Sequence, residues 1–386
     1  MMRAVWALLL AASTASAQPG AAPVDPVVAN FREYRAALER NDLPAAERAA
    51  AAALMASQAA QGPRTAVLAL NLAHLRLELG GDYDALSPAR TAHALATAST
   101  DAGVDPVAAA LALGRAEVAA GDAAGAARLH GALAAAEANS ALQIDAYNAA
   151  VTLGTAAIDA KDYDSARRAW ATAARLAQAT DDPPFSRARA LTGEGAAIFL
   201  AAADRGAAPS ADQAAVLARA DAQAASDAFA TAQRLLMPAA FAAMQGSTLS
   251  AGQRAFAQAM VWQSALLAKI QSANGALPAA PTFGGDMPPF DDNALCRMRT
   301  IRNGAQVEYP PEALERFGVG AVVVHLALDT NGAITQRTIA AAIPPGVLAD
   351  SVEKVADEWR IEKDPSSVAG CRIPSSAYVN VRFVLE

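Results

Sequence analysis

Four aspartates lie 40 residues apart in the first half of the chain, each in a short break within an otherwise helical pattern. A second break, rich in Gly, Asp and Pro, falls within most periods, for example at Gly62-Pro63. Two breaks per period mean two helices per repeat, and periods of roughly 20 to 50 residues are typical of stacked helical repeats. We therefore predict a solenoid of helical hairpins over residues 26–272. The four aspartates are Asp42, Asp82, Asp122 and Asp162.

Small side chains follow the repeated aspartates at helical spacing. After Asp162, the small residues Ala166 and Ala173 alternate with the bulky residues Trp170 and Leu176. Small side chains let two helices approach closely, and one bulky residue fills the space between neighbouring pairs. This pattern resembles the tetratricopeptide class, although the period of 40 residues is longer than the roughly 34 residues of that class.

Two polar motifs in this region are interpreted as structural. An Asp at the start of a helix usually accepts a hydrogen bond from an unpaired backbone N–H. We therefore interpret the repeated aspartates as N-caps rather than as a carboxylate cluster. The segment Thr192-Gly193-Glu194-Gly195 looks like a fragment of a glycine-rich phosphate loop, but no strand pattern precedes it. We interpret it as a close crossing of two helices.

The composition excludes two classes of protein. The chain has 31 basic and 38 acidic residues, a net charge of −7 and no cluster of Lys and Arg, so nucleic acid is not an expected partner. The hydrophobic fraction is 54%, but about a hundred alanines inflate it. Because no run of about 18 apolar residues is present, a polytopic membrane protein is excluded.

No arrangement of residues indicates catalysis. The four histidines lie in different predicted elements, and no two have the spacing of metal ligands. The chain has no Gly-x-Ser-x-Gly motif, no phosphate-binding loop, and no cysteine with an evident histidine base. We therefore predict no enzyme activity, no metal site and no cofactor.

The first 17 residues have the pattern of a cleavable signal peptide. Arg3 precedes an apolar stretch from Ala4 to Ala12, and Ala15-Ser16-Ala17 follows as an A-x-A cleavage site. Nine apolar residues form a helix of about 14 Å, half of a hydrocarbon layer of about 30 Å. We therefore predict export, with Gln18 as the new N-terminus and no transmembrane span after cleavage.

Residues 273–292 are predicted to be a semi-stiff linker. The segment is crowded with Gly and Pro, including Asn274-Gly275 and Pro288-Pro289, and it has few large apolar side chains. The alanine enrichment ends here, since only roughly a dozen alanines follow residue 300. A separate C-terminal domain is therefore expected over residues 293–386.

Cys296 and Cys371 are the two cysteines of the chain, and both lie in this C-terminal domain. In an exported chain, an even number of cysteines in one compact domain favours a disulfide. The alternative is two separate buried thiols.

The last hundred residues have the pattern of a small antiparallel sheet with one helix. Residues 320–328 alternate, with Val322, Val324 and Leu326 on one face, which predicts a half-buried strand. A tight turn at residues 329–332 leads into a second strand. Apolar residues at helical spacing then predict a helix from Leu348 to Trp359, and residues 377–385 form a last strand.

This order of elements and its residues resemble the TonB C-terminal domain family. Three departures from the family pattern are Ile361 in place of an aromatic residue, Arg337 in place of an apolar strand residue, and the two added cysteines. The residues that carry the resemblance are Tyr309-Pro310-Pro311-Glu312-Ala313, Gly320 to Val324, the Asp329 to Gly332 turn, Leu348 through Trp359-Arg360-Ile361, and Val381-Arg382-Phe383.

The resemblance implies a periplasmic module that binds a protein partner of the cell envelope, typically an extended segment of an outer-membrane receptor added to the sheet edge. In the family the last strand lies at that edge, so Tyr378, Asn380 and Arg382 are predicted to contact the partner. The alternative reading is that these residues are only the polar face of a two-sided sheet. A fold that merely caps the solenoid is a further alternative.

The fold class is therefore α+β multidomain. It comprises an N-terminal all-α helical-hairpin solenoid, tetratricopeptide-like, and a small C-terminal ββαβ TonB-like domain. The expected function is that of a periplasmic protein-interaction protein with the solenoid as scaffold. The alternative function is an energy transducer of TonB type that supports transport through an outer-membrane receptor, which requires the N-terminal segment to be retained as an anchor. The partner, any ligand of the solenoid and the oligomeric state are not specified by the sequence.

Overall fold

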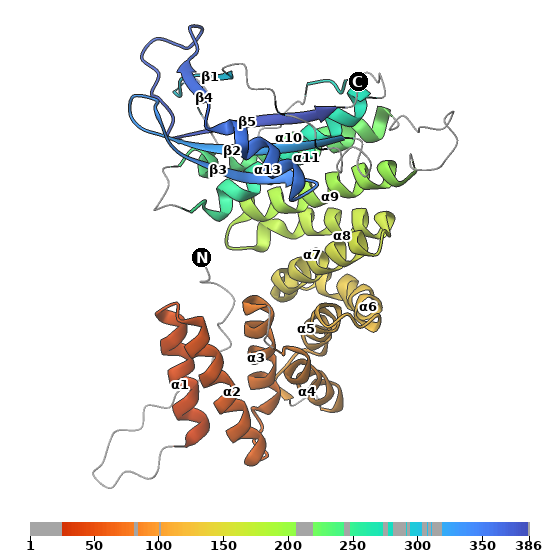
Figure 1. Cartoon of the computed structure of the whole chain (residues 1–386). Helices are drawn as coiled ribbons and strands as arrows, with labels where there is room; N and C mark the ends of the chain where they lie inside the picture. The colour runs from red at the N-terminus through yellow and green to blue at the C-terminus, as the bar shows by residue number, and fades with distance from the viewer. Residues whose placement is uncertain are drawn as a thin grey trace, which may run out of the picture. The chain divides into compact units, whose positions relative to one another are not determined.

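A computed structural model gives the arrangement of the chain (Figure 1). The predicted signal peptide, Asp82, most of the 273–292 segment and most of the Tyr309 to Ala313 motif lie outside the described residues. The structure describes residues 25–80, 84–99, 102–205, 219–242, 248–272, 277–280, 291, 294–302, 307, 310 and 319–384.

The described chain divides into two compact units. One comprises Met1–Ala156 with Ala179–Asp181, and the other comprises Ala157–Gln178 with Asp182–Glu386. The division falls within the helical region and not at the predicted linker, because the last helices share a core with the C-terminal sheet. Among the described residues, no helix combines the length and the apolar character that a membrane crossing requires.

The helical region follows the predicted alternation of helices and breaks. In the first unit α1 packs on α2, α3 on α4, and α5 on α6. The helices are α1 (Pro26–Glu39), α2 (Leu43–Ala59), α3 (Thr65–Leu79), α4 (Leu86–Ala98), α5 (Pro106–Ala119), α6 (Ala124–Ala138), α7 (Gln143–Asp159), α8 (Tyr163–Leu176), α9 (Pro183–Arg205), α10 (Arg219–Ala240) and α11 (Ala251–Ser272).

The 40-residue register reflects one repeated way of ending a helix and starting the next. The residue before the aspartate has a positive φ at Asn41, Gly121 and Lys161. The backbone N–H of the following aspartate then reaches back five residues, for example from Asp162 to the carbonyl of Ala157 at 2.8 Å. This is the hydrogen bond of a Schellman C-cap.

The aspartate side chains then cap the next helix, as predicted. Asp42 accepts from the N–H of Ala45, and Asp162 accepts from the N–H of Ser165, each at 3.1 Å. Asp122 accepts from the N–H of Ala124, the first residue of α6, at 2.9 Å. The aspartates are therefore caps where the structure describes them.

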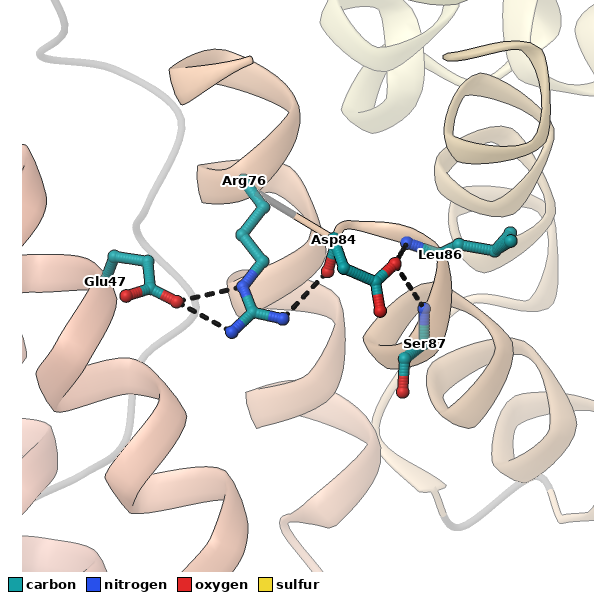
Figure 2. A network of polar contacts seen from close by, with 5 residues as sticks. All are labelled: Glu47, Arg76, Asp84, Leu86 and Ser87. Carbon is teal, nitrogen blue, oxygen red and sulfur yellow. Dashed lines mark hydrogen bonds and ion pairs between the residues drawn. The ribbon is translucent and has the colours of Figure 1, made fainter. Parts of the chain in front are cut away.

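An arginine joins neighbouring hairpins within the first unit (Figure 2). Arg76 of α3 donates to Oε1 of Glu47 in α2 at 2.9 and 2.7 Å, and it donates to the carbonyl of Asp84 at 2.8 Å. The Asp84 carboxylate in turn accepts from the N–H groups of Leu86 and Ser87 at the start of α4. One side chain thus links α2, α3 and the start of α4.

The glycine segment in α9 is a close helix crossing, as predicted. A Cβ on Gly193 would lie 2.3 Å from the ring of Trp170 in α8, and one on Gly195 would lie 2.7 Å from the ring of Phe229 in α10. Contacts this short do not occur between real side chains. Glycine is required here because two large aromatic rings are packed directly against the helix backbone.

The C-terminal region forms two small antiparallel sheets. The larger has the strand order β3-β2-β5, and the smaller pairs β1 with β4. Helix α13 (Val347–Ala356) lies between β3 and β4 in the chain. The strands are β1 (Met298–Arg302), β2 (Val319–Leu328), β3 (Ile334–Ile343), β4 (Trp359–Lys363) and β5 (Ser376–Val384).

Strand β2 is buried along its whole length, so the prediction of a half-buried strand was wrong. Its Val322, Val324 and Leu326 pack with Leu348, Val352 and Trp359 on the α13 side. On the other side, Ala321 and Val323 share a core with residues of α9, α10 and α11 (Figure 1). The sheet is therefore a middle layer between α13 and α11.

Two features of the C-terminal region account for departures from the resembled pattern. Cys296 and Cys371 form a disulfide, as predicted, next to the backbone bonds that join Cys296 and Ala294 to Arg372. Arg337 of β3 donates to the carbonyls of Asp357 and Trp359, just beyond the end of α13, at 3.4 Å each. A cation at a helix C-terminus is favourable because the carbonyls there are unpaired.

Residues 277–280 of the predicted linker are bonded to α10 at one point. The side-chain amide of Gln223 accepts from the N–H of Ala279 at 2.8 Å and donates to its carbonyl at 3.2 Å. The side-chain amide thus bonds both the N–H and the C=O of one residue, as a neighbouring backbone strand would. It attaches residues 277–280 to the same unit that contains the sheet.

Candidate functional site

Strand β5 lies at one edge of the larger sheet, as the resemblance implies. It pairs with β2 on one side, and no strand of the described residues pairs with its other side. The register between β2 and β5 is regular from Val319↔Val384 to Ala327↔Ser376, without a bulge. The edge is therefore a straight row of backbone donors and acceptors.

One hydrogen bond establishes which backbone groups of β5 point outward. The N–H of Leu328 donates to the carbonyl of Ser375 at 3.0 Å, in the same register as the rest of the pair. In an antiparallel pair, residues that bond the neighbour alternate with residues whose N–H and C=O point away from it. The odd-numbered residues from Ser375 onward therefore bond β2. The outward groups belong to Ser376, Tyr378, Asn380 and Arg382.

The opposite edge, at β3, is less suited to strand addition. The register between β2 and β3 shifts between Val323 and Val324 and again between Ala327 and Leu328. In both places β3 holds an extra residue, Ala340 in the first and Thr335 in the second. Bulges bend and twist a strand, and they are one way in which proteins blunt a sheet edge.

The side chains of Tyr378 and Asn380 face the helices. The Tyr378 hydroxyl donates to the carbonyl of Ala240 at 3.0 Å, and its ring centroid lies 4.8 Å from that of Phe256 in α11. Burial raises the pKa of Tyr378, so its hydroxyl stays protonated. Asn380 donates from Nδ2 to the hydroxyl of Ser264 in α11.

Arg382 is the exposed member of the three predicted contact residues. The structure therefore brings the three residues together on one strand and one face, but α10 and α11 cover part of that face. Their backbone groups, in contrast, point away from β2 along the sheet edge.

Sequence reasoning missed a buried polar cluster behind this edge. His325 of β2 and Ser376 of β5 are both 0% exposed, and His325 Nε2 lies 3.0 Å from Ser376 Oγ. Gln253 of α11, 1% exposed, reaches the same hydroxyl at 3.5 Å. The only signal in the sequence was a single histidine in the otherwise apolar run of residues 319–328.

This His325–Ser376 pair is not arranged as a nucleophile and its base. Neither side chain is exposed to substrate, and burial lowers the pKa of His325 to about 4, so the ring is a weak base. Elsewhere in the described ranges, no group of three or more His, Cys, Asp or Glu side chains is placed to hold a metal ion.

The comparisons with known proteins gave a family match in the C-terminal region. The search of curated proteins found no match to the chain. A protein-family model, described as Gram-negative bacterial TonB protein C-terminal, matches residues 305–385. This range contains β2, β3, α13, β4 and β5. The C-terminal region of the chain is therefore a TonB C-terminal domain.

Proposed function

We propose that this chain is an exported protein-interaction protein whose TonB C-terminal domain binds an extended segment of an envelope protein at the edge of β5. The observation that carries the proposal is the position of β5 at the sheet edge in a regular register, which turns the backbone groups of Tyr378, Asn380 and Arg382 away from β2. Backbone pairing supplies affinity in this mode, and side chains beside the edge supply specificity. The family match supports a role in protein interaction in the cell envelope.

The helical region is proposed to act as a scaffold for this edge. Helices α9, α10 and α11 support the sheet from behind through a shared apolar core. The hairpins of the first unit add further helical surface, which is the part of solenoid proteins that commonly holds a second protein. The boundaries of the solenoid (26–272), the linker (273–292) and the C-terminal domain (293–386) remain predictions.

A photoreactive amino acid at position 382 of the full chain, expressed in its native envelope, tests the proposal. We expect a crosslinked adduct with an envelope protein, and we expect Asn380→Pro to abolish it. Proline removes an N–H that faces the partner and leaves the bonds to β2 intact. The matched control places the same probe at Thr335, an exposed position on the bulged strand β3.

The outcomes separate strand addition from its alternatives. An adduct at position 382 that persists in the folded Asn380→Pro variant would rule out backbone pairing at this edge. Equal adducts at 382 and at 335 would indicate non-specific contact. Because Asn380→Pro also removes the hydrogen bond to Ser264, Asn380→Ala serves as the control that removes the side chain and keeps the N–H.

A second candidate is an energy transducer of TonB type, which the family match also favours. It requires an N-terminal anchor, and the apolar stretch from Ala4 to Ala12 is short for that purpose. Sequencing the N-terminus of the mature protein distinguishes the two candidates. A start at Gln18 excludes the anchored transducer, whereas a retained Arg3 excludes the cleaved form.

A further inference from the structure

A fully buried histidine lies where the sheet meets α11. His325 Nε2 contacts the Ser376 hydroxyl, and Gln253 of α11 reaches the same hydroxyl. The other ring nitrogen, Nδ1, is buried without a hydrogen-bond partner among the described residues. Both faces of β2 are covered, by α13 on one side and by the α9–α11 core on the other. This site holds a neutral imidazole and provides no counter-ion for a charged one.

The groups around His325 are neutral on every side. Strand β3 presents Thr338 as its cross-strand neighbour, β5 presents Ser376 and Tyr378, and α11 presents Gln253. The Tyr378 ring lies edge-on to the imidazole with centroids 5.1 Å apart, and its hydroxyl points to a backbone carbonyl at the end of α10. No charged group contributes to the pKa of His325, which burial alone lowers from 6.5 to about 4.

We propose that His325 makes the contact between the sheet and α11 acid-sensitive, so that protonation of its ring favours a state in which α11 has separated from the sheet. A charged group without a partner is costly in an apolar interior. The ring reaches water only when one covering layer leaves. His325 itself bonds Ser376 within the sheet, and the polar bonds that join the sheet to a covering layer lie on the α11 side, where Ser376, Tyr378 and Asn380 contact α11 and the end of α10.

The pH range follows from the two pKa values. For a base whose pKa is lower in the docked state than in the undocked state, docking is fully stable above the undocked pKa. Docking then weakens as the pH falls from 6.5 toward about 4. Between pH 7 and pH 5, these values give an increase of about 20-fold in the undocking equilibrium constant. Undocking would also release the side chains of Tyr378 and Asn380.

Hydrogen exchange of the full chain tests the proposal. Wild type and His325→Gln are compared at pH 7, 6 and 5, with the amides of α11 and β5 as the readout. Comparison at the same pH cancels the pH dependence of the chemical exchange rate. We expect the ratio of wild-type to variant exchange rates in α11 to rise about 20-fold from pH 7 to pH 5. His130→Gln, which changes an exposed histidine of α6, is expected to leave that ratio constant.

Two results would overturn the proposal. One is an α11 exchange ratio for His325→Gln that does not change with pH. The other comes from the wild-type protein alone, which covers the case in which His325→Gln does not fold. The chain has four histidines, so their ring protons can be titrated individually by NMR. A His325 ring that titrates near pH 6.5 while α11 amides stay protected would show that the docked site accepts the charge.

Discussion

Replacing Gly193 by alanine measures how closely α8 and α9 approach. In a helix interior, replacing Gly by Ala normally stabilises the protein by about 1 kcal/mol. Here the new Cβ would lie 2.3 Å from the ring of Trp170, a side chain that is 5% exposed. The ring must move by about 1 Å to restore an ordinary contact, and such overpacking costs about 1–3 kcal/mol. Because a buried indole has little room to move, we expect an overpacking cost of about 2–3 kcal/mol, which leaves Gly193→Ala destabilising by about 1–2 kcal/mol after the helix-propensity gain.

Urea unfolding provides the assay, and the chain provides a matched control. All three tryptophans within the described residues, Trp170, Trp262 and Trp359, lie in the second compact unit, so their fluorescence reports its unfolding. Gly131 is exposed in α6 and has no atom within 4 Å of its added Cβ. Gly131→Ala, followed by circular dichroism, is therefore expected to stabilise by about 0.5–1 kcal/mol. If Gly193→Ala stabilises the chain as Gly131→Ala does, the close crossing is refuted.

Two further sets of substitutions and one chemical reduction test the contacts that join elements. Asp42→Ala should cost about 1 kcal/mol in urea unfolding, whereas Asp42→Asn, which keeps a capping oxygen, should cost little; equal losses would contradict the capping role. Reducing the disulfide, whose cysteines are 75 residues apart, should lower the free energy of unfolding of the second unit by about 4 kcal/mol, and an unchanged urea midpoint would contradict this. Arg76→Met should cost about 2 kcal/mol, because it leaves the Glu47 carboxylate, 11% exposed, without its partner. The double variant Arg76→Met/Glu47→Met should recover most of that loss, and additive losses would show that the pair is not coupled.

The helical part of the fold was predictable because its signals are local. A helix end that needs a positive φ and a capping carboxylate involves three or four neighbouring residues, so it repeats visibly at Asn41-Asp42 and Lys161-Asp162. The glycines of α9 were interpretable for a similar reason, since no strand preceded them. The disulfide followed from the number of cysteines and the expected export.

The environment of the sheet was only partly predictable. The run of residues 319–328 is apolar apart from His325, which is the pattern of a strand buried on both faces. The alternation of larger and smaller side chains drew the interpretation toward a half-buried strand. The partner helix α11 could not be identified, because many alanine-rich helices in the chain have faces of similar composition. The pairing of β1 with β4 was missed because each strand has only five residues. The two strands are also some 60 residues apart in the sequence, so no local sequence pattern indicates that they pair.

The family resemblance located the sheet edge at β5. It did not predict which backbone groups of β5 point outward or which of its side chains are covered. Which backbone groups point outward depends on one hydrogen bond, from Leu328 to Ser375. The positions of Tyr378 and Asn380 against α10 and α11 depend on the docking of the sheet. A side chain that alternates outward from a strand is not thereby exposed, since another layer can cover it.

The middle position of the sheet has a mechanical consequence. If a segment bound beside β5 were pulled along its own length, the force would run parallel to the strand. All the backbone hydrogen bonds between the segment and β5 would then resist together, in shear. The packed layer formed by Val323 of β2 with Val261 and Leu266 of α11 would pass that load into the helices over a broad area. Stretching the chain between Val384 and Ala251 by optical tweezers should therefore show a force peak when this layer shears. Separation at negligible force would show that the layer does not carry the load.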